Sequence, residues 1–100
     1  MTGPLETDAA APPMMSGEAR VDVLARLARI DGQVQGVARM VDADRYCVDV
    51  LDQIASVRAA LDAASRVVLR NYLDRCVRRA LAEGDPLVIE EVMRAVGRAK

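Results

Sequence analysis

Apolar residues recur at helical spacing along most of the chain. From Arg20 onward they alternate at intervals of four and three residues: Val23, Leu27, Ile30, Val34, Val37 and Val41. These intervals are typical of a helix with one apolar stripe, so the pattern predicts a first helix over about residues 20–41. Gly32 and Gly36 lie inside it, where each costs up to about 1 kcal/mol relative to Ala. Close packing against another backbone would explain the two glycines, and a kink is the alternative.

A second, longer helix is predicted over about residues 45–83. This stretch contains neither Gly nor Pro and is rich in Ala, Leu and Arg. Asp44 is suited to be its N-cap, and Gly84 is suited to end it in the left-handed conformation. At 1.5 Å per residue this helix would be about 60 Å long. The first helix is too short to cover it, so a third helix or another chain must cover the rest of its apolar surface.

A shorter third helix is predicted after Gly84. Asp85 would be its N-cap and Pro86 would occupy the first turn, where proline is tolerated. Its apolar side comprises Leu87, Val88, Ile89, Val92, Met93 and Val96. Residues 1–17 contain three Pro and show no periodicity, so we expect a disordered N-terminal tail there, with a short helical lead-in at its end as the alternative. One helical domain is expected over residues 18–100. The predicted fold class is all-α, with a three-helix protomer.

Composition adds the expectation that the chain forms oligomers. Hydrophobic residues make up 52%, but there is no Phe and no Trp, and Ala, Val and Leu suit thin seams between helices better than one thick core. The net charge of -1 does not indicate nucleic-acid binding, although 13 of the 14 basic residues are Arg, which suits phosphate and base contacts. Neither a secretory signal nor an apolar run of about 20 residues is visible. A cytoplasmic protein with reduced thiols and no membrane contact is therefore expected.

The two cysteines are spaced so that they cannot meet within one chain. Cys47 and Cys76 are 29 residues apart on one predicted helix, which corresponds to about 43 Å and close to eight whole turns. Both thiols then point to one side of the helix. Antiparallel pairing of two copies would bring Cys47 of one chain to Cys76 of the other, twice, about an axis near Leu61 and Asp62. Small residues flank that axis: Ala59, Ala60, Ala63 and Ala64.

Both thiols have surroundings that favour the thiolate. Cys47 falls in the first turn of the predicted helix, where the helix dipole favours negative charge. Cys76 has Arg75, Arg78 and Arg79 near it in the sequence. The alternative is that both are inert buried cysteines, which is a common fate of unpaired Cys. The spacing favours a site formed between two chains.

Two stretches carry a family resemblance. The segments RLARIDGQVQGVARMVDADRYCVDVLDQI and NYLDRC, at this separation, resemble the copper-sensitive operon repressor (CsoR/RcnR) family over about residues 20–98. The resemblance implies an all-α protomer that forms an antiparallel four-helix-bundle homodimer, and then a dimer of dimers, a homotetramer. It implies repression of an operon, with operator DNA released when an effector binds. No catalytic constellation is visible, so the chain is not expected to be an enzyme.

The Cu(I)-sensing branch of that family binds the metal through a Cys near the start of the second helix and through a His and a Cys of the other subunit. By resemblance, the two cysteines match Cys47 and Cys76, whereas Tyr72 occupies the His position. Tyr46 and Glu91 match residues that support the His. Cu(I) prefers thiolate and imidazole, and a phenol is a poor substitute. Two thiolates can still hold Cu(I), so copper is weakened as an effector but not excluded.

A sister branch senses reactive sulfur through two cysteines without the His, although it lacks the Tyr before the first Cys. We therefore predict a DNA-binding repressor that leaves its operator when reactive sulfur modifies the Cys47 and Cys76 site, with no cofactor required. The first alternative is a Cu(I) sensor with an altered site built from Cys47, Tyr72 and Cys76. The nickel and cobalt branch needs several His ligands, of which this chain has none, and the formaldehyde branch lacks the second Cys.

The DNA contact is expected on the first two helices. The candidate residues are Arg20, Arg26, Arg29, Arg58, Arg66 and Arg70. Arg26 and Arg66 match positions that matter in relatives, whereas Gln35 and Ala63 replace residues that are often basic there. A solvated charged surface is the common alternative for exposed Arg. A helical interaction module without a DNA role is therefore the second alternative function.

Overall fold

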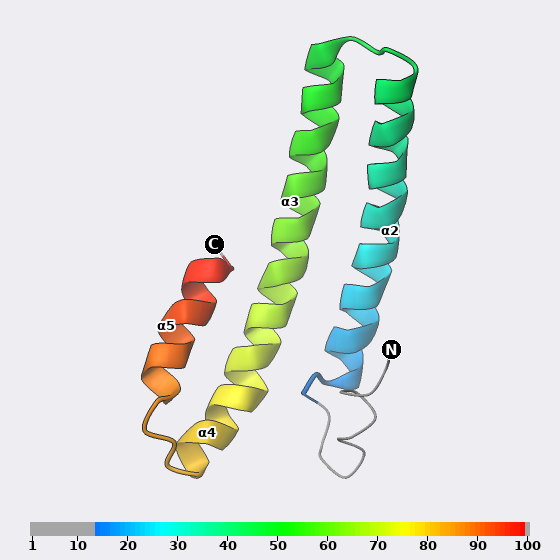
Figure 1. Ribbon diagram of the computed structural model, residues 1–100. Coiled ribbons are helices and arrows are strands. Elements are labelled where there is room, and N and C mark those ends of the chain that lie inside the picture. Colours follow the sequence, from blue (N-terminus) through cyan, green and yellow to red (C-terminus); the bar gives the residue numbers. More distant parts are fainter. Residues whose placement is uncertain (1–13, 100) are drawn as a thin grey trace, which may run out of the picture.

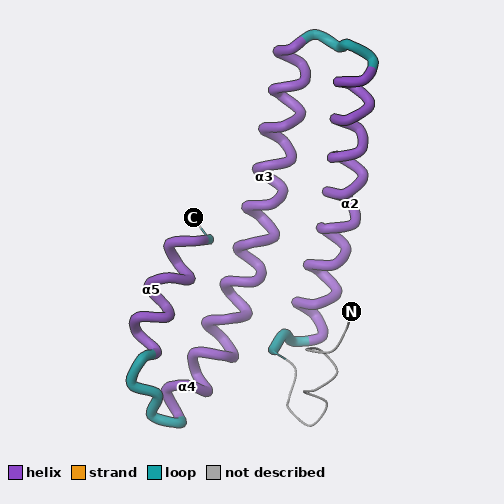
Figure 2. The backbone as a smooth tube through the Cα atoms, in the orientation of Figure 1, coloured by secondary structure: helices purple, strands orange, loops and turns teal. Residues whose placement is uncertain are grey.

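The computed structural model describes residues 14–99 and shows a helical hairpin with a third, shorter helix folded back on it (Figure 1). The hairpin consists of α2 (Gly17–Asp42) and α3 (Cys47–Asn71). The second arm continues through a π-helical turn, η1 (Tyr72–Val77), into α4 (Arg78–Ala82), and α5 (Val88–Arg98) returns beside it. All regular structure in this range is helical (Figure 2). The predicted all-α, three-helix protomer is confirmed, because α3, η1 and α4 form one continuous rod.

Helix α2 begins earlier than its apolar periodicity predicts. Ser16 is the N-cap, and its hydroxyl oxygen accepts a hydrogen bond from the Ala19 backbone N at 3.0 Å. The first thirteen residues of the predicted tail lie outside the described residues. Its last four, residues 14–17, lie against α3, where the Asn71 side chain binds the backbone groups of Met14 and Ser16. Gly17 already belongs to α2, and disorder of the tail as a whole stays a prediction.

The same backbone motif closes both arms of the hairpin. After α2, the backbone N of Asp44 donates to the Val41 carbonyl and that of Arg45 donates to the Met40 carbonyl. This is a Schellman motif, with Asp44 in the left-handed region at φ 57. Gly84 has the equivalent role after α4 at φ 72, as predicted. Asp44 is therefore the end of one helix rather than the N-cap of the next, and that prediction is wrong.

The N-cap predicted for the third helix is also displaced. The Asp85 side chain accepts a hydrogen bond from the Leu87 backbone N at 2.9 Å, which makes a local turn. Helix α5 then begins at Val88, so Leu87 is the capping residue and provides no side-chain hydrogen bond. Asp85 stabilises the approach to α5 rather than its first turn.

The interior of the protomer is very small. Among the described residues the buried apolar side chains are Val23, Ile30, Ala64 and Val88, and none of them is completely enclosed. Many large apolar side chains of the hairpin are exposed instead: Val21, Leu24, Leu27, Val34, Val41, Val48, Leu51, Ile54, Leu61 and Val68. Contiguous exposed apolar surface marks an interaction site. A single chain therefore leaves most of the apolar surface of α2 and α3 uncovered.

The small residues contribute differently from expectation. A Cβ at Gly32 would meet nothing within 4 Å, and one at Gly36 would meet only the end of the Arg39 side chain. Neither glycine therefore packs closely against another backbone of this chain, nor interrupts α2. Ala64 is buried and Ala60 is half-buried beside Ile30 of α2. These two alanines serve the packing of α2 on α3, whereas they were expected at an interface between chains.

Within residues 14–99, no helix is both long enough and apolar enough to cross a membrane.

Candidate functional site

Cys47 and Cys76 lie at opposite ends of the long arm. Cys47 is the first residue of α3 and therefore lies in its first turn, as predicted. Its side chain is exposed. Cys76 lies in η1 and is partly buried. The protein extends 55 Å along its longest axis, and the two ends of the arm are far apart in Figure 1. A ligand shared by the two thiols therefore requires a second chain, as their spacing predicts.

The π turn changes which way Cys76 faces. In η1 the backbone hydrogen bonds close over five residues rather than four, so each turn takes up more residues than an α-helical turn. The expectation that both thiols point to one side assumed uniform α-helix between them. Because Cys76 is inside η1, its direction is rotated away from that expectation. Single π turns inside helices are frequent at functional sites.

Cys76 opens into a pocket of about 310 Å³ at the base of the hairpin. Its lining comes from the segment before α2, from η1 and α4, and from α5: Met14, Tyr72, Arg75, Cys76, Arg79, Ala80, Glu83 and Glu91. Two of the three arginines expected around Cys76 line this pocket, and Arg78 does not. The pocket thus brings a thiol, a thioether, a phenol, carboxylates and guanidinium groups together from four segments of the chain.

Tyr72 is bonded to α5 through its hydroxyl group. The Tyr72 hydroxyl donates to Glu91 Oε2 at 2.5 Å. This hydrogen bond, with burial and the negative charge of Glu91, raises the pKa of Tyr72 to about 12. The phenol therefore stays protonated at neutral pH and makes a weak metal donor. Of the two residues predicted to support a His at this position, Glu91 contacts Tyr72 directly.

Tyr46, the other predicted supporting residue, lies elsewhere. It immediately precedes α3 beside Cys47, and 70% of its surface is exposed. It is therefore at the far end of the arm from Glu91 and Tyr72. Within one chain, Tyr46 accompanies Cys47, and Glu91 accompanies Cys76.

Asn71 is a functional candidate that the sequence analysis did not include. Within residues 14–99 it is the one buried polar residue. Its Nδ2 donates to the Met14 carbonyl at 2.9 Å, and its Oδ1 accepts from the Ser16 backbone N at 3.0 Å. The segment before α2 is thereby fixed to the last residue of α3, directly before η1. A single Asn in a long helix has no distinguishing sequence signal, because its partners are 55 and 57 residues away.

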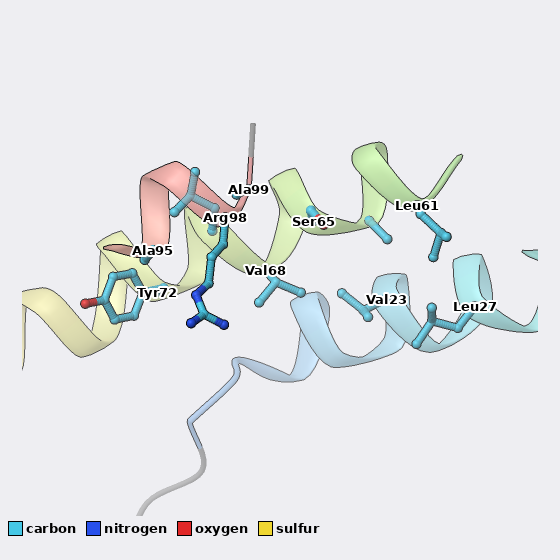
Figure 3. Close-up of a pocket in the computed structure, with 11 residues that line it drawn as sticks. Val23, Leu27, Leu61, Ser65, Val68, Tyr72, Ala95, Arg98 and Ala99 are labelled. Atoms are coloured by element: carbon cyan, nitrogen blue, oxygen red, sulfur yellow. The ribbon is translucent and has the colours of Figure 1, made fainter. Parts of the chain in front are cut away.

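A second, apolar groove of about 480 Å³ lies between α2, α3 and α5 (Figure 3). Val23 and Leu27 of α2 face Leu61 and Val68 of α3 across it, and the Tyr72 ring lies at its other end. Tyr72 therefore contributes its ring to the apolar groove and its hydroxyl group to the Cys76 pocket. The phenol connects the exposed apolar face of the hairpin with the thiol site.

The candidate DNA-binding arginines are spread along the hairpin. Arg20 and Arg29 of α2 are exposed, as are the candidates on α3: Arg58, Arg66 and Arg70. Arg26 is half-exposed and makes an ion pair with Asp22, with Nε 2.7 Å from the carboxylate oxygen. Arg26 and Arg29 line one small pocket with Gln33 and Ala60. These side chains remain available to phosphates, apart from the competition of Asp22 for Arg26.

The metal-ligating side chains of the described residues are scattered over the protomer. Within residues 14–99, no group of three or more His, Cys, Asp and Glu side chains is arranged to hold a metal ion. The two thiols lie instead towards opposite ends of a long helical arm, on a protomer whose hairpin exposes apolar side chains. The fold and the described side chains together define an all-helical protomer with a largely exposed apolar hairpin and two widely separated thiols.

The chain belongs to the metal-sensitive transcriptional repressor family, whose model matches residues 19–98. Members of this family are repressors rather than enzymes, which confirms both the resemblance and the prediction that the chain is not an enzyme. The copper-sensing transcriptional repressor RicR of Mycobacterium tuberculosis is 51% identical over 61 residues, which is 61% of this chain and 64% of RicR. CsoR of Bacillus subtilis, also named as copper-sensing, is 41% identical over 70 residues, 70% of this chain and 69% of that protein.

Solved structures agree on the fold. The copper-sensing repressor CsoR with Cu(I) from Geobacillus thermodenitrificans superposes with a TM-score of 0.76 at 35% identity, over 87% of this chain and 90% of that one. The nickel-responsive regulator InrS superposes with a TM-score of 0.69 at 35% identity, over 90% and 99%. The chain spans less than two thirds of the M. tuberculosis relatives that it matches, 64% of RicR and 62% of CsoR.

Proposed function

We propose that this protein is a DNA-binding repressor that responds to Cu(I) held between subunits by Cys47 of one chain and Cys76 of its partner. The observation that carries the proposal is the placement of the two thiols at opposite ends of one continuous helical arm. Antiparallel pairing of two such arms would bring a Cys47 and a Cys76 to the same end of the pair, at both ends. The copper-sensing names of RicR and CsoR favour copper over other effectors.

Assembly follows from the distribution of apolar side chains. Leu27 and Val34 of α2 are exposed on the same hairpin as Leu51, Ile54 and Leu61 of α3. A second hairpin laid across this face would bury them and form a four-helix bundle. Each buried large aliphatic side chain contributes roughly 1.5–3 kcal/mol. This face is the proposed homodimer interface, and a pair of dimers would form the homotetramer.

The donor chemistry fits Cu(I) through sulfur. Thiolates are the soft ligands that Cu(I) selects, and bound Cu(I) supplies a link between two subunits. Arg75 and Arg79 line the Cys76 pocket, where their positive charges compensate thiolates. Tyr72 holds its proton in a hydrogen bond to Glu91 and therefore stays outside the proposed donor set. With no His in the chain, nickel fits this site poorly.

A second candidate effector is reactive sulfur, which is favoured by two thiols without any imidazole. The Cys47 thiolate would take one sulfane sulfur from a polysulfide and become a persulfide. The polysulfide would depart with one sulfur atom fewer. The partner subunit's Cys76 thiolate would then attack the Cys47 sulfur of the resulting persulfide. Hydrosulfide leaves, and an inter-subunit disulfide remains. The two thiols are oxidised by two electrons and the transferred sulfur is reduced.

Subunit complementation tests the shared site. Cys47→Ser and Cys76→Ser homo-oligomers each retain only half of every site. A mixed dimer of the two variants contains one intact site and one without thiols. Cu(I) titration against a chromophoric chelator should show weak binding by either variant alone. Tight binding should return after equal amounts of the variants are unfolded and refolded together, with one Cu(I) bound per mixed dimer. Because random pairing makes about half of the dimers mixed, the whole sample should bind about a quarter as much Cu(I) as the parent protein.

Two results decide between the effectors. Tight Cu(I) binding coupled to loss of operator affinity supports copper. Polysulfide treatment that gives reducible cross-linked dimers, with loss of operator affinity only when both cysteines are present, supports reactive sulfur. If Cys47→Ser alone binds Cu(I) as tightly as the parent protein, the shared site is refuted.

The DNA role is tested with matched arginine variants. Arg66→Ala should weaken binding to the protein's own promoter DNA and reduce its salt dependence, because a phosphate contact is lost. Arg78→Ala changes an exposed Arg outside the candidate surface and should leave both unchanged. If the two variants bind DNA with the same affinity and the same salt dependence, Arg66 does not contact the DNA. Absence of any shift by the parent protein at low salt favours the helical interaction module.

A further inference from the structure

The segment before α2 places a methionine beside Cys76. The Met14 carbonyl oxygen lies 3.9 Å from Cys76 Sγ, and Met14 and Cys76 line the same pocket. More than this one contact holds the Met14 backbone in place. The side chain of Asn71, which is only 9% exposed, binds the backbone of both Met14 and Ser16. A buried amide that satisfies two backbone groups fixes this segment against η1. Met14 is therefore held within reach of the thiol.

The Met14 side chain has no structural role that would occupy its sulfur. Of its surface, 74% is exposed, so the side chain is not part of the core. Methionine is unbranched, with three rotatable bonds and a polarisable thioether. Starting from a backbone already next to Cys76, that thioether can reach the thiol without movement of a helix. An exposed, flexible thioether beside a thiol is a suitable soft donor.

The other groups of the pocket do not compete for a soft metal. The Tyr72 hydroxyl group is engaged with Glu91. Glu83 and Glu91 offer hard carboxylate oxygens, and the two arginines offer no lone pair. Cu(I) is bound best by thiolate and thioether sulfur. Within the described residues of this pocket, the soft donors are therefore Cys76 and Met14.

We propose that the Met14 thioether is a third sulfur ligand of Cu(I) at this site, together with Cys76 and Cys47 of the partner subunit. This inference rests on the proposed function and deepens it, since it names the donor that compensates for the missing imidazole. The site then takes donors from three segments: η1, the segment before α2, and the start of α3 in the second chain. Met14 also couples the entry of α2 to the metal.

Sulfur counting by X-ray absorption tests the proposal on the full chain loaded with Cu(I) alone. The copper edge of the parent protein should report three sulfur neighbours, and Met14→Leu should report two. Leu preserves the size and apolar character of Met. Met15→Leu is the matched control, because Met15 adjoins Met14 but does not line the pocket. Met14→Leu should also weaken Cu(I) binding at least about tenfold, whereas Met15→Leu should not.

Selenomethionine makes the assignment specific to one residue. Protein grown on selenomethionine should show a copper–selenium neighbour in the parent and in Met15→Leu, and none in Met14→Leu. A copper–selenium signal that survives Met14→Leu, or two-coordinate sulfur in the parent, overturns the role of Met14 while leaving the Cys47 and Cys76 site intact. Failure of the parent to compete with the chelator for Cu(I) refutes the proposed function as well.

Discussion

The ring of Tyr72 lines the apolar groove, and its hydroxyl group binds Glu91 at the Cys76 pocket. The protonation of this hydroxyl group can be measured directly. The hydrogen bond to Glu91 raises its pKa from 10 to about 12, and a group whose pKa is raised by folding stabilises the fold while it is protonated. The stabilisation is therefore complete below pH 10 and is lost as the pH rises towards 12. In the physiological range this contact is insensitive to pH.

Ultraviolet titration of phenolate in a Tyr46→Phe background isolates Tyr72, because the chain has only two tyrosines. The midpoint should lie near 12. Adding Glu91→Gln removes the negative charge and should move the midpoint back towards 10. A midpoint near 10 already in the Tyr46→Phe parent would show that the hydrogen bond to Glu91 is absent in solution.

Asp44 carries the backbone strain of the turn between α2 and α3. At φ 57 it is in the left-handed region, which costs a side chain with a Cβ about 1 kcal/mol or more. Asp44→Gly should therefore leave the free energy of unfolding unchanged or raise it by up to about 1 kcal/mol. Asp44→Val should lower it by roughly 1–2 kcal/mol, since β-branched residues tolerate this region poorly. Urea denaturation measures both, and equal stability of the two variants contradicts the left-handed assignment.

At the scale of elements, apolar periodicity predicts the helices well and their ends less well. The long second arm, the position of Cys47 in its first turn and the left-handed Gly84 all follow from local sequence rules. Asp44 and Asp85 were misassigned because Asp is favoured both at N-caps and in turns, and only backbone geometry separates these uses. The role of Met14 depends on its contact with Asn71, which no local pattern reveals.

The π turn could not be predicted, because no residue type specifies it. A π turn holds one residue more than an α turn, so it can lose a residue and revert to α-helix while the following segment keeps its direction. Deleting Asp74 from η1 should therefore cost little helix content and little stability. Deleting Asp62 from α3 removes the same residue type from regular helix and rotates all that follows by about 100°. Both positions are exposed.

Circular dichroism and thermal unfolding compare the two deletions. We expect the protein without Asp74 to unfold at a higher temperature than the protein without Asp62. Because the deletion also shortens the interval between Cys76 and Asn71, which binds the Met14 carbonyl, its Cu(I) affinity should fall even where its fold persists. The opposite order of unfolding temperatures would mean that η1 is a fixed part of the rod.

For the whole molecule, the small core leads us to expect that stability depends on the proposed assembly. When folding and association are coupled, the unfolding temperature rises with protein concentration. A tenfold increase in chain concentration should raise it by several degrees, roughly in proportion to the added association free energy. Leu61→Glu places a charge on the exposed apolar face. This variant should be smaller by light scattering and should unfold at a lower temperature that is independent of concentration.

If the protein is stable only when assembled, as proposed, repression should have a threshold in the amount of protein synthesised. Chains too dilute to associate would display Leu24, Val41 and Leu51 to the chaperones and proteases that recognise unfolded segments. We therefore expect the half-life of the repressor in the cell to lengthen as its abundance increases. Reduced synthesis would then abolish repression abruptly at one expression level. With a repressor that is stable as a monomer, repression would decline in proportion to its synthesis.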